Sequence, residues 1–227
     1  MQTLEKSELA PTPTQPASAL HAAAADLLRD HGASLAEGAE RAGVTPPAAA
    51  AILLAEGQFA APAVDERMPV RFEPYAFFQA TGRWLIATHK DQAAEYRAFA
   101  EARAVDPEAA LACTRMGLGQ VSGLEAQQAG FTDADAMMQQ LQGNPAAQVQ
   151  SLIDLVQATP ALQTALHEEN WRDVALLRAG PGYAAIGYDD VLAASAQAYK
   201  EVSSPIGVGG GDDGDAGSDK PKRRRKS

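Results

Sequence analysis

One glutamate in this 227-residue chain stands where an acid catalyst could work. Glu56 ends an apolar run that begins at Pro46, and Gly57 follows it directly. At the C-terminal end of an apolar helix, both the surroundings and the helix dipole disfavour a charged carboxyl group. A carboxyl group that keeps its proton can act as a general acid, for instance on the leaving oxygen of a glycosidic bond. Glu56 is therefore the candidate catalytic residue, and the alternative is an idle carboxylate that is solvated or ion-paired.

Other residues that could do chemistry are given structural roles. We predict that Glu73 pairs with Arg71 or Arg67, and that Trp84 and Trp171 are core anchors and not platforms for sugar rings. The four histidines show no metal-ligand spacing, so no metal ligand, metal catalysis or cofactor is predicted.

The elements that must position Glu56 are predicted to be helices. Oxygen-bearing side chains followed closely by proline or an acidic residue are typical of helix starts, and they occur at Thr45, Asp106, Asn144 and Asn170. Gly43 is typical of a residue just beyond a helix end. The expected helices span residues 19–29, 35–42, 46–56, 96–104, 109–114 and 149–158. Only residues 70–72 and 83–86 favour extended structure, so the fold class is mostly α-helical.

Composition predicts a soluble protein with an acidic body. Apolar residues make up 46% of the chain, the formal net charge is -10, and the estimated pI is about 4.8, which gives the body no basic surface for nucleic acid. No apolar run approaches the roughly 20 residues of a membrane span, and residues 1–18 lack the apolar core of a signal peptide. The single cysteine, Cys113, excludes an intramolecular disulfide and is predicted to be a small buried side chain.

Both ends of the chain differ from its middle. We expect a flexible N-terminal arm over residues 1–16, one helical domain over 17–200, and a flexible Gly/Asp-rich and basic tail over 201–227. The tail could be a solvated appendage whose acidic half screens its basic half, or it could dock on an acidic protein face or on nucleic acid. The candidate partner-binding residues are Lys220, Lys222, Arg223, Arg224, Arg225 and Lys226.

Several motifs occur together in an order that points to one family. They are Ala55-Glu56-Gly57, Arg67-Met68-Pro69-Val70-Arg71-Phe72-Glu73, Val105-Asp106-Pro107, Gly180-Pro181-Gly182-Tyr183 and Tyr188-Asp189-Asp190. With them, residues 35–200 resemble the N-acetylmuramidase domain of phage endolysins. The resemblance implies a single lysozyme-like helical domain with peptidoglycan as its substrate. It implies that Glu56 is the general acid, and that Gln120, Tyr183 and the backbone near Gly117 position the glycan or water.

The departures from the family pattern are as informative as the matches. Residues 115–123 replace the family's serine-tryptophan-glycine-leucine-phenylalanine-glutamine-isoleucine-methionine-glycine, and they lose the serine hydroxyl and both aromatic rings. Arg178-Ala179 replaces a tyrosine-asparagine pair, which removes a side-chain amide, and Tyr75 replaces a histidine. These losses predict a site that is catalytically weak or inactive.

Two classes of function follow from the resemblance. The favoured one is a virion-associated protein with a structural or assembly role in a tail, baseplate or capsid, in a multimeric assembly with other phage proteins. The alternative is an active N-acetylmuramidase that cleaves the β-1,4 bond of peptidoglycan during phage entry or host lysis, and glycan binding without cleavage lies between the two. The expected location is the virion, or the host cytoplasm before assembly or lysis, with no membrane partner and with nucleic acid contacted only through the tail.

Overall fold

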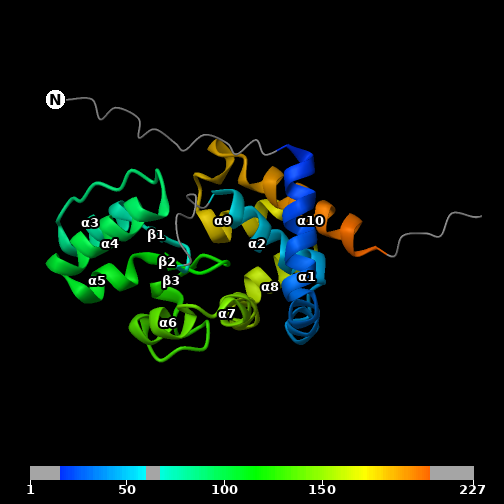
Figure 1. The fold of residues 1–227 in the computed structure, drawn as a ribbon, viewed down its shortest axis with the longest axis horizontal. Coiled ribbons are helices and arrows are strands. Elements are labelled where there is room, and N and C mark those ends of the chain that lie inside the picture. Colours follow the sequence, from blue (N-terminus) through cyan, green and yellow to red (C-terminus); the bar gives the residue numbers. More distant parts are fainter. Residues whose placement is uncertain (1–15, 60–66, 205–227) are drawn as a thin grey trace, which may run out of the picture.

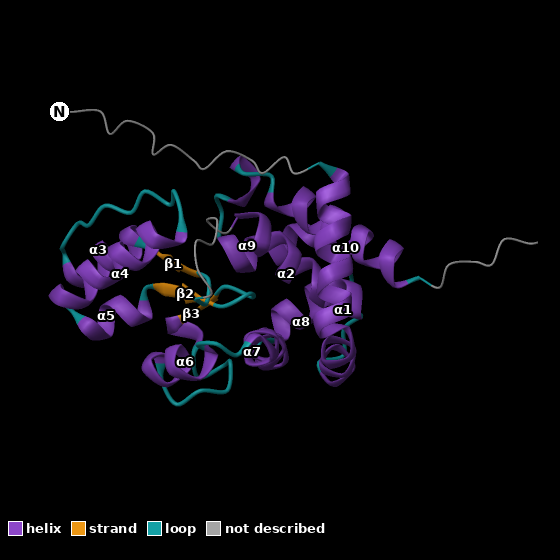
Figure 2. Ribbon diagram, viewed as in Figure 1, coloured by secondary structure: helices purple, strands orange, loops and turns teal. Residues whose placement is uncertain are grey.

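A computed structural model describes residues 16–59 and 67–204, which fold into ten α-helices, two short 3-10 helices and a small sheet (Figures 1 and 2). The α-helices are α1 (Ala17–Arg41), α2 (Pro46–Phe59), α3 (Pro74–Thr81), α4 (Gln92–Val105), α5 (Pro107–Ala112), α6 (Ala134–Leu141), α7 (Pro145–Ala158), α8 (Pro160–His167), α9 (Trp171–Ala179) and α10 (Tyr188–Ser203). The 3-10 helices are η1 (Gly123–Glu125) and η2 (Tyr183–Ala185). The predicted mostly α-helical fold class is confirmed.

Four predicted helix starts are confirmed, whereas the helix expected from residue 96 begins earlier, at Gln92. At Thr45, Asp106, Asn144 and Asn170, the side-chain oxygen accepts a hydrogen bond from the backbone N–H three residues later. These bonds satisfy N–H groups that have no partner inside the first turn of a helix. Gly43 has a φ of 67°, the left-handed backbone expected just beyond a helix end.

Three local predictions were wrong. The two helices expected over residues 19–29 and 35–42 are one continuous helix, α1, which runs through Gly32. An added Cβ at Gly32 would lie 2.8 Å from Leu28 Cδ1 in the same helix and 3.8 Å from Tyr199 Oη of α10. Thr114 does not end α5 but begins a strand that pairs with the predicted strand at 70–72. Residues 83–86 form a loop with no strand pairing.

The sheet has three short antiparallel strands in the order β1 (Val70–Phe72), β2 (Thr114–Met116) and β3 (Val121–Ser122). The outer edge of β1 is closed by side chains of α4. Gln92 accepts from the Val70 N–H at 2.9 Å and donates to the Val70 carbonyl at 3.1 Å, and Glu95 Oε2 accepts from the Phe72 N–H at 3.0 Å. The strand edge is therefore not open to pairing with another chain.

The apolar side chains gather in two clusters, which form two lobes in Figure 1. One cluster belongs to α1, α2, α7, α8, α9 and α10, and the other to the sheet and α3–α6. Helix α7 joins them, since Ile153 lies in the first cluster and Leu155 in the second. Within the described ranges, no helix is long and apolar enough to span a membrane.

Large side chains from most of the elements form the core. Among those that are buried are Ile52, Leu53, Phe72, Phe77, Leu111, Ile153, Leu155, Leu162 and Tyr188. Leu118 and Trp171 are partly buried against the first cluster. Leu176 is 47% exposed on the outer face of α9, and Trp84 is 60% exposed, so the prediction that Trp84 is a core anchor was wrong. Cys113 is buried as predicted, and burial raises the pKa of its thiol.

The predicted arm and tail, including Lys220 to Lys226, lie outside the described residues, apart from Pro16 and residues 201–204. The domain limits of 17 and 200 stay a prediction.

Candidate active site

Glu56 lies in the last turn of α2 and is held through one of its two carboxyl oxygens. The Tyr188 hydroxyl, at the start of α10, donates to Glu56 Oε1 at 2.7 Å. Arg178 Nη2 lies 3.7 Å from the same oxygen. Within the part of the chain that the structure describes, no hydrogen-bond donor reaches Oε2. The carboxyl group is thus oriented while one oxygen stays available to a ligand.

Tyr188 remains a hydrogen-bond donor at any ordinary pH. Complete burial of its hydroxyl raises its pKa well above the usual range, and the negative charge of Glu56 and the bond to that carboxylate raise it further. Its ring is tilted against Phe59, with the two centroids 5.3 Å apart, so the side chain is fixed by packing as well.

Arg178 is a buried cation at the centre of the site. Its Nη2 donates to the carbonyls of Gly119 at 2.8 Å and Gln120 at 3.0 Å, and its Nη1 lies 3.6 Å from Glu125 Oε2. Burial by itself would lower the pKa of Arg178, but its interactions with Glu56, the Tyr188 hydroxyl and Glu125 outweigh burial and raise it. The guanidinium therefore joins α9 to the turn between β2 and β3 as a permanent positive charge.

A second carboxylate faces the same space. Glu73 Oε1 lies 3.5 Å from Arg71 Nε and 3.4 Å from Arg115 Nε, so the predicted pairing of Glu73 with Arg71 is confirmed. Arg115 also donates to the carbonyls of Gln120 at 3.2 Å and Arg178 at 3.1 Å. Strand β1, strand β2 and helix α9 are thus tied together around the two carboxylates.

These groups enclose a cavity of about 170 Å³ between the two lobes. It is lined by Glu56, Phe59, Arg71, Glu73, Arg115, Arg178, Ala179, Ile186 and Tyr188. Among the described residues, three buried donors of the lining side chains have no hydrogen-bond partner, namely Arg71 Nε and the Nε and Nη1 atoms of Arg178. Buried donors of this kind gain most from water or from the oxygens of a ligand.

The other predicted site residues do not line this cavity. Gln120 is buried with a φ of 46°, and its amide donates to the Gly117 carbonyl at 2.8 Å, so it holds the turn between β2 and β3. Gly117 has a φ of 74°, and a Cβ there would lie 3.0 Å from the Gln148 side chain. Tyr183, in η2, packs on the first apolar cluster. Substrate contact by these three residues stays a prediction.

Sequence reasoning did not assign a role in the site to Arg178 or Tyr188. A signal for Arg178 was present, because Val174, Ala175 and Arg178 share the helical spacing that places them on the buried face of α9. Nothing in the sequence reports that the Tyr188 hydroxyl meets a carboxylate in another helix. Among residues 16–59 and 67–204, no group of three His, Cys, Asp or Glu side chains could hold a metal ion.

A carboxyl group in a cavity between a helical lobe and a lobe with a small antiparallel sheet defines a lysozyme-like protein. The family model described as N-acetylmuramidase matches residues 45–200, and the chain belongs to this family. The crystal structure of the Burkholderia AP3 phage endolysin is similar, with a TM-score of 0.62 over 83% of this chain and 86% of that one. The identity is 23%, so this match shows a shared fold. No curated protein matches the chain.

Proposed function

We propose that the chain is an N-acetylmuramidase that cleaves the β-1,4 bond between N-acetylmuramic acid and N-acetylglucosamine in peptidoglycan, with Glu56 as its general acid. One observation carries this proposal. The Glu56 carboxyl group lines a cavity shared with a second carboxylate, and Tyr188 fixes one of its oxygens while the other has no donor among the described residues. Membership in the N-acetylmuramidase family supports peptidoglycan as the substrate.

In this mechanism Glu56 gives its proton to the bridging oxygen as the bond from that oxygen to C1 of the muramic acid unit breaks. Positive charge then develops at C1, and a water molecule adds its hydroxyl there. The remaining proton of the water restores Glu56, directly or through solvent. Glu73, fixed by Arg71 and Arg115, supplies the nearby negative charge that stabilises C1 in the transition state.

A second candidate is a virion-associated protein in which this site is weak or idle and the fold has an assembly role. The observation that favours it is the buried Arg178 guanidinium, 3.7 Å from Glu56 Oε1. A fixed cation interacts most favourably with a charged carboxylate, whereas an acid catalyst has to give up a proton. On this proposal the protein is carried in the particle and meets neighbouring subunits through residues 220–226.

The two candidates are separated by the release of reducing sugar from purified peptidoglycan. Under the muramidase proposal, the unmodified protein hydrolyses the glycan and Glu56→Gln lowers the rate by about 10²–10⁴-fold without changing the unfolding midpoint. The matched control is Glu101→Gln, which changes an exposed glutamate on α4 and keeps full activity. An inactive wild-type protein that is recovered from purified particles would instead support the second candidate.

A further inference from the structure

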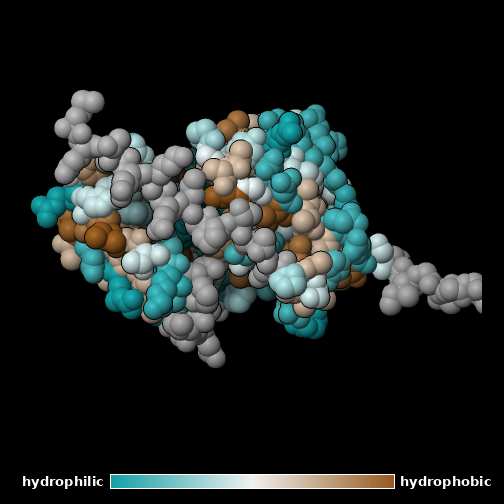
Figure 3. All heavy atoms as spheres, turned by 90° about the horizontal axis from the view of Figure 1, so that it is seen from above, coloured by the Kyte–Doolittle hydropathy of each residue, from teal (hydrophilic) through white to brown (hydrophobic). Residues whose placement is uncertain are grey.

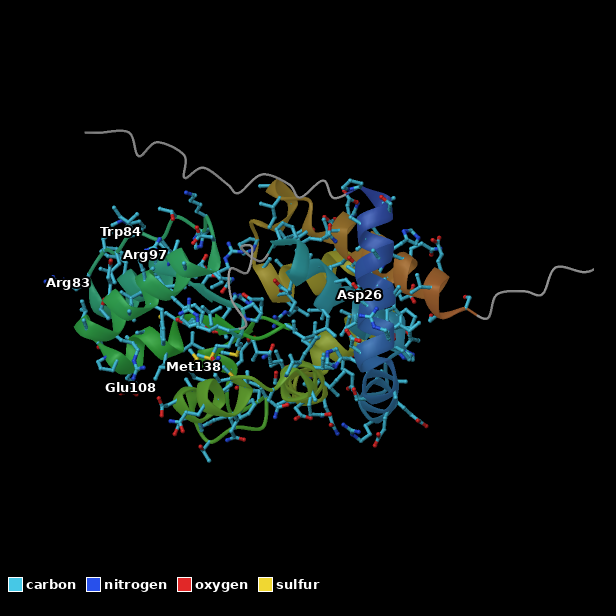
Figure 4. All side chains as sticks on the ribbon, in the orientation of Figure 1. Asp26, Arg83, Trp84, Arg97, Glu108 and Met138 are labelled. Carbon is cyan, nitrogen blue, oxygen red and sulfur yellow. The ribbon has the colours of Figure 1, made fainter. Side chains whose placement is uncertain are left out.

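Four large apolar side chains of α3 and of the loop that follows it are exposed. Tyr75 and Phe78 of α3 are 62% and 40% exposed, and Trp84 and Ile86 of the following loop are 60% and 75% exposed. Trp84 lies at the outer edge of the lobe that holds α3 and α4 (Figure 4). Seen from above, hydrophobic atoms gather on this lobe among hydrophilic ones (Figure 3). Exposed apolar groups that cluster in this way mark a binding surface more often than scattered ones do.

The loop that carries Trp84 is shaped to hold it outward. Exposure alternates along the loop, with Trp84 and Ile86 pointing out while Leu85 and Ala87 pack on the second apolar cluster. The Trp84 ring meets Phe78 edge to face, with their centroids 5.7 Å apart. The exposed Trp84 ring is therefore held in place by its contact with Phe78.

Both ends of the loop are fixed. At one end, Gly82 has a φ of 70° and closes α3. At the other end, His89 has a φ of 49°, and its Nδ1 lies 2.7 Å from Oε1 of the buried Glu95. The second oxygen of Glu95 accepts from the backbone of Phe72, so the loop is joined through one carboxylate to the strand that leads into Glu73.

This surface and the candidate active site share one lining residue, Glu73. Tyr75, Trp84 and Ile86 line a cavity of about 560 Å³ that also includes Thr88 and Glu73. Glu73 lines the Glu56 cavity as well. Glu73 therefore borders both cavities, and a ligand that extended from Glu56 past Glu73 would enter the cavity lined by Tyr75 and Trp84.

The chemistry of this second cavity suits a sugar better than a protein side chain. A pyranose ring has an apolar face of C–H groups and an edge of hydroxyls, so it needs flat apolar surface with polar groups around it. Tyr75 and Trp84 supply aromatic rings, and Glu73, Thr88 and His89 supply polar atoms at the border.

We infer that Tyr75 and Trp84 form a saccharide-binding subsite, which holds sugar units of the peptidoglycan glycan strand that lie beyond the unit at Glu56. This inference rests on the proposed muramidase function, because that function places a glycan strand in the Glu56 cavity. It assigns the aromatic surface to the wall glycan and not to a protein partner.

The test measures binding without cleavage, in a Glu56→Gln background. The ligands are peptidoglycan glycan strands freed of their stem peptides, the free stem peptide, and cellohexaose, and affinity is measured by calorimetry. We expect the stripped strands to bind, with Trp84→Ala raising Kd about tenfold or more and Trp84→Phe raising it less. Tyr75→Ala should act in the same direction. Leu124→Ala, which truncates a side chain that is 69% exposed outside this cavity, is the matched control and should leave Kd unchanged.

Each outcome bears on one proposal. Unchanged affinity in both Trp84→Ala and Tyr75→Ala, or equal binding of the stem peptide alone, would overturn the subsite and leave the surface to a protein partner. Binding of the strands that depends on Trp84, in a protein with no hydrolytic activity, would support the subsite while the catalytic proposal fails. Hydrolysis that depends on Glu56 but not on Trp84 or Tyr75, at saturating and at low substrate concentration, would support the catalytic proposal and overturn the subsite.

Discussion

The Tyr188 hydroxyl and Glu56 Oε1 are 2.7 Å apart although 132 residues separate them in the chain. Their contact depends on the packing of α10 against α2, the helix pair through which the C-terminal part of the fold closes on the apolar helix that carries the acid (Figure 1). The orientation of Glu56 is therefore set by the last helix and not by the residues near it in sequence.

Tyr188→Phe removes this hydrogen bond and keeps the ring that packs on Phe59. We expect kcat to fall while KM changes little, because the hydroxyl orients the acid and the ring still fills its space. The free energy of unfolding should fall by about 1–2 kcal/mol, since Glu56 Oε1 loses a buried donor. Tyr199→Phe, which changes another buried tyrosine far from Glu56 in sequence, is the control for stability and should not change kcat.

Alkaline pH should destabilise the protein partly through Tyr188. In the unfolded chain a tyrosine releases its proton near its ordinary pKa of about 10, whereas burial raises the pKa of Tyr188 in the folded chain. The folded state then holds more protons, so the free energy of unfolding falls as pH rises from about 10 toward the folded pKa.

In this pH window the wild-type slope should exceed that of Tyr188→Phe by up to about 1.4 kcal/mol per pH unit. Urea unfolding between pH 8 and pH 11 measures both slopes. Tyr199, whose pKa is also raised by burial, is present in both proteins and cancels in the comparison. Equal slopes would show that the Tyr188 hydroxyl is not buried in solution.

Arg178→Met tests whether the buried guanidinium holds the site together. The change leaves Glu56 and Glu125 without their cation and the Gly119 carbonyl without its donor, while the Gln120 carbonyl keeps only its bond from Arg115. We expect the free energy of unfolding to fall by about 2–4 kcal/mol, measured by urea denaturation.

The control is Arg172→Met, which removes an exposed arginine from the same helix and should change stability by less than about 0.5 kcal/mol. If Arg178→Met lost no more stability than this control, the guanidinium would be held by water and not by the groups named here.

The helix ends could be predicted from the sequence because each depends on residues close together in the chain. Asp106 and Asn144 cap helices by bonding to a backbone N–H three residues later, so the signal and the structure are both local. The continuity of α1 through Gly32 was not predicted, and the contact of this glycine with Tyr199 joins segments that are far apart in the chain.

The candidate site could be predicted only in part, because its contacts join distant segments. Glu56 was identified from its apolar helix and from the family motif, but the positions of Arg178 and Tyr188 around it depend on how α9 and α10 pack. Trp84 was assigned to the core because tryptophan is usually buried, and the sequence does not show that the described part of the fold leaves this side chain exposed.

Two glycine substitutions should change stability in opposite directions for reasons that the structure gives. Gly57 lies in the last turn of α2, and among the described residues no atom outside the helix backbone lies within 4 Å of an added Cβ. Gly57→Ala should therefore raise the free energy of unfolding by about 0.5–1 kcal/mol through helix propensity. At Gly123 an added Cβ would lie 2.0 Å from the Leu111 carbonyl oxygen, so η1 and α5 would have to separate. Gly123→Ala should therefore cost at least about 2 kcal/mol in urea denaturation. An unchanged free energy of unfolding in Gly123→Ala would show that η1 does not pack against α5 as described.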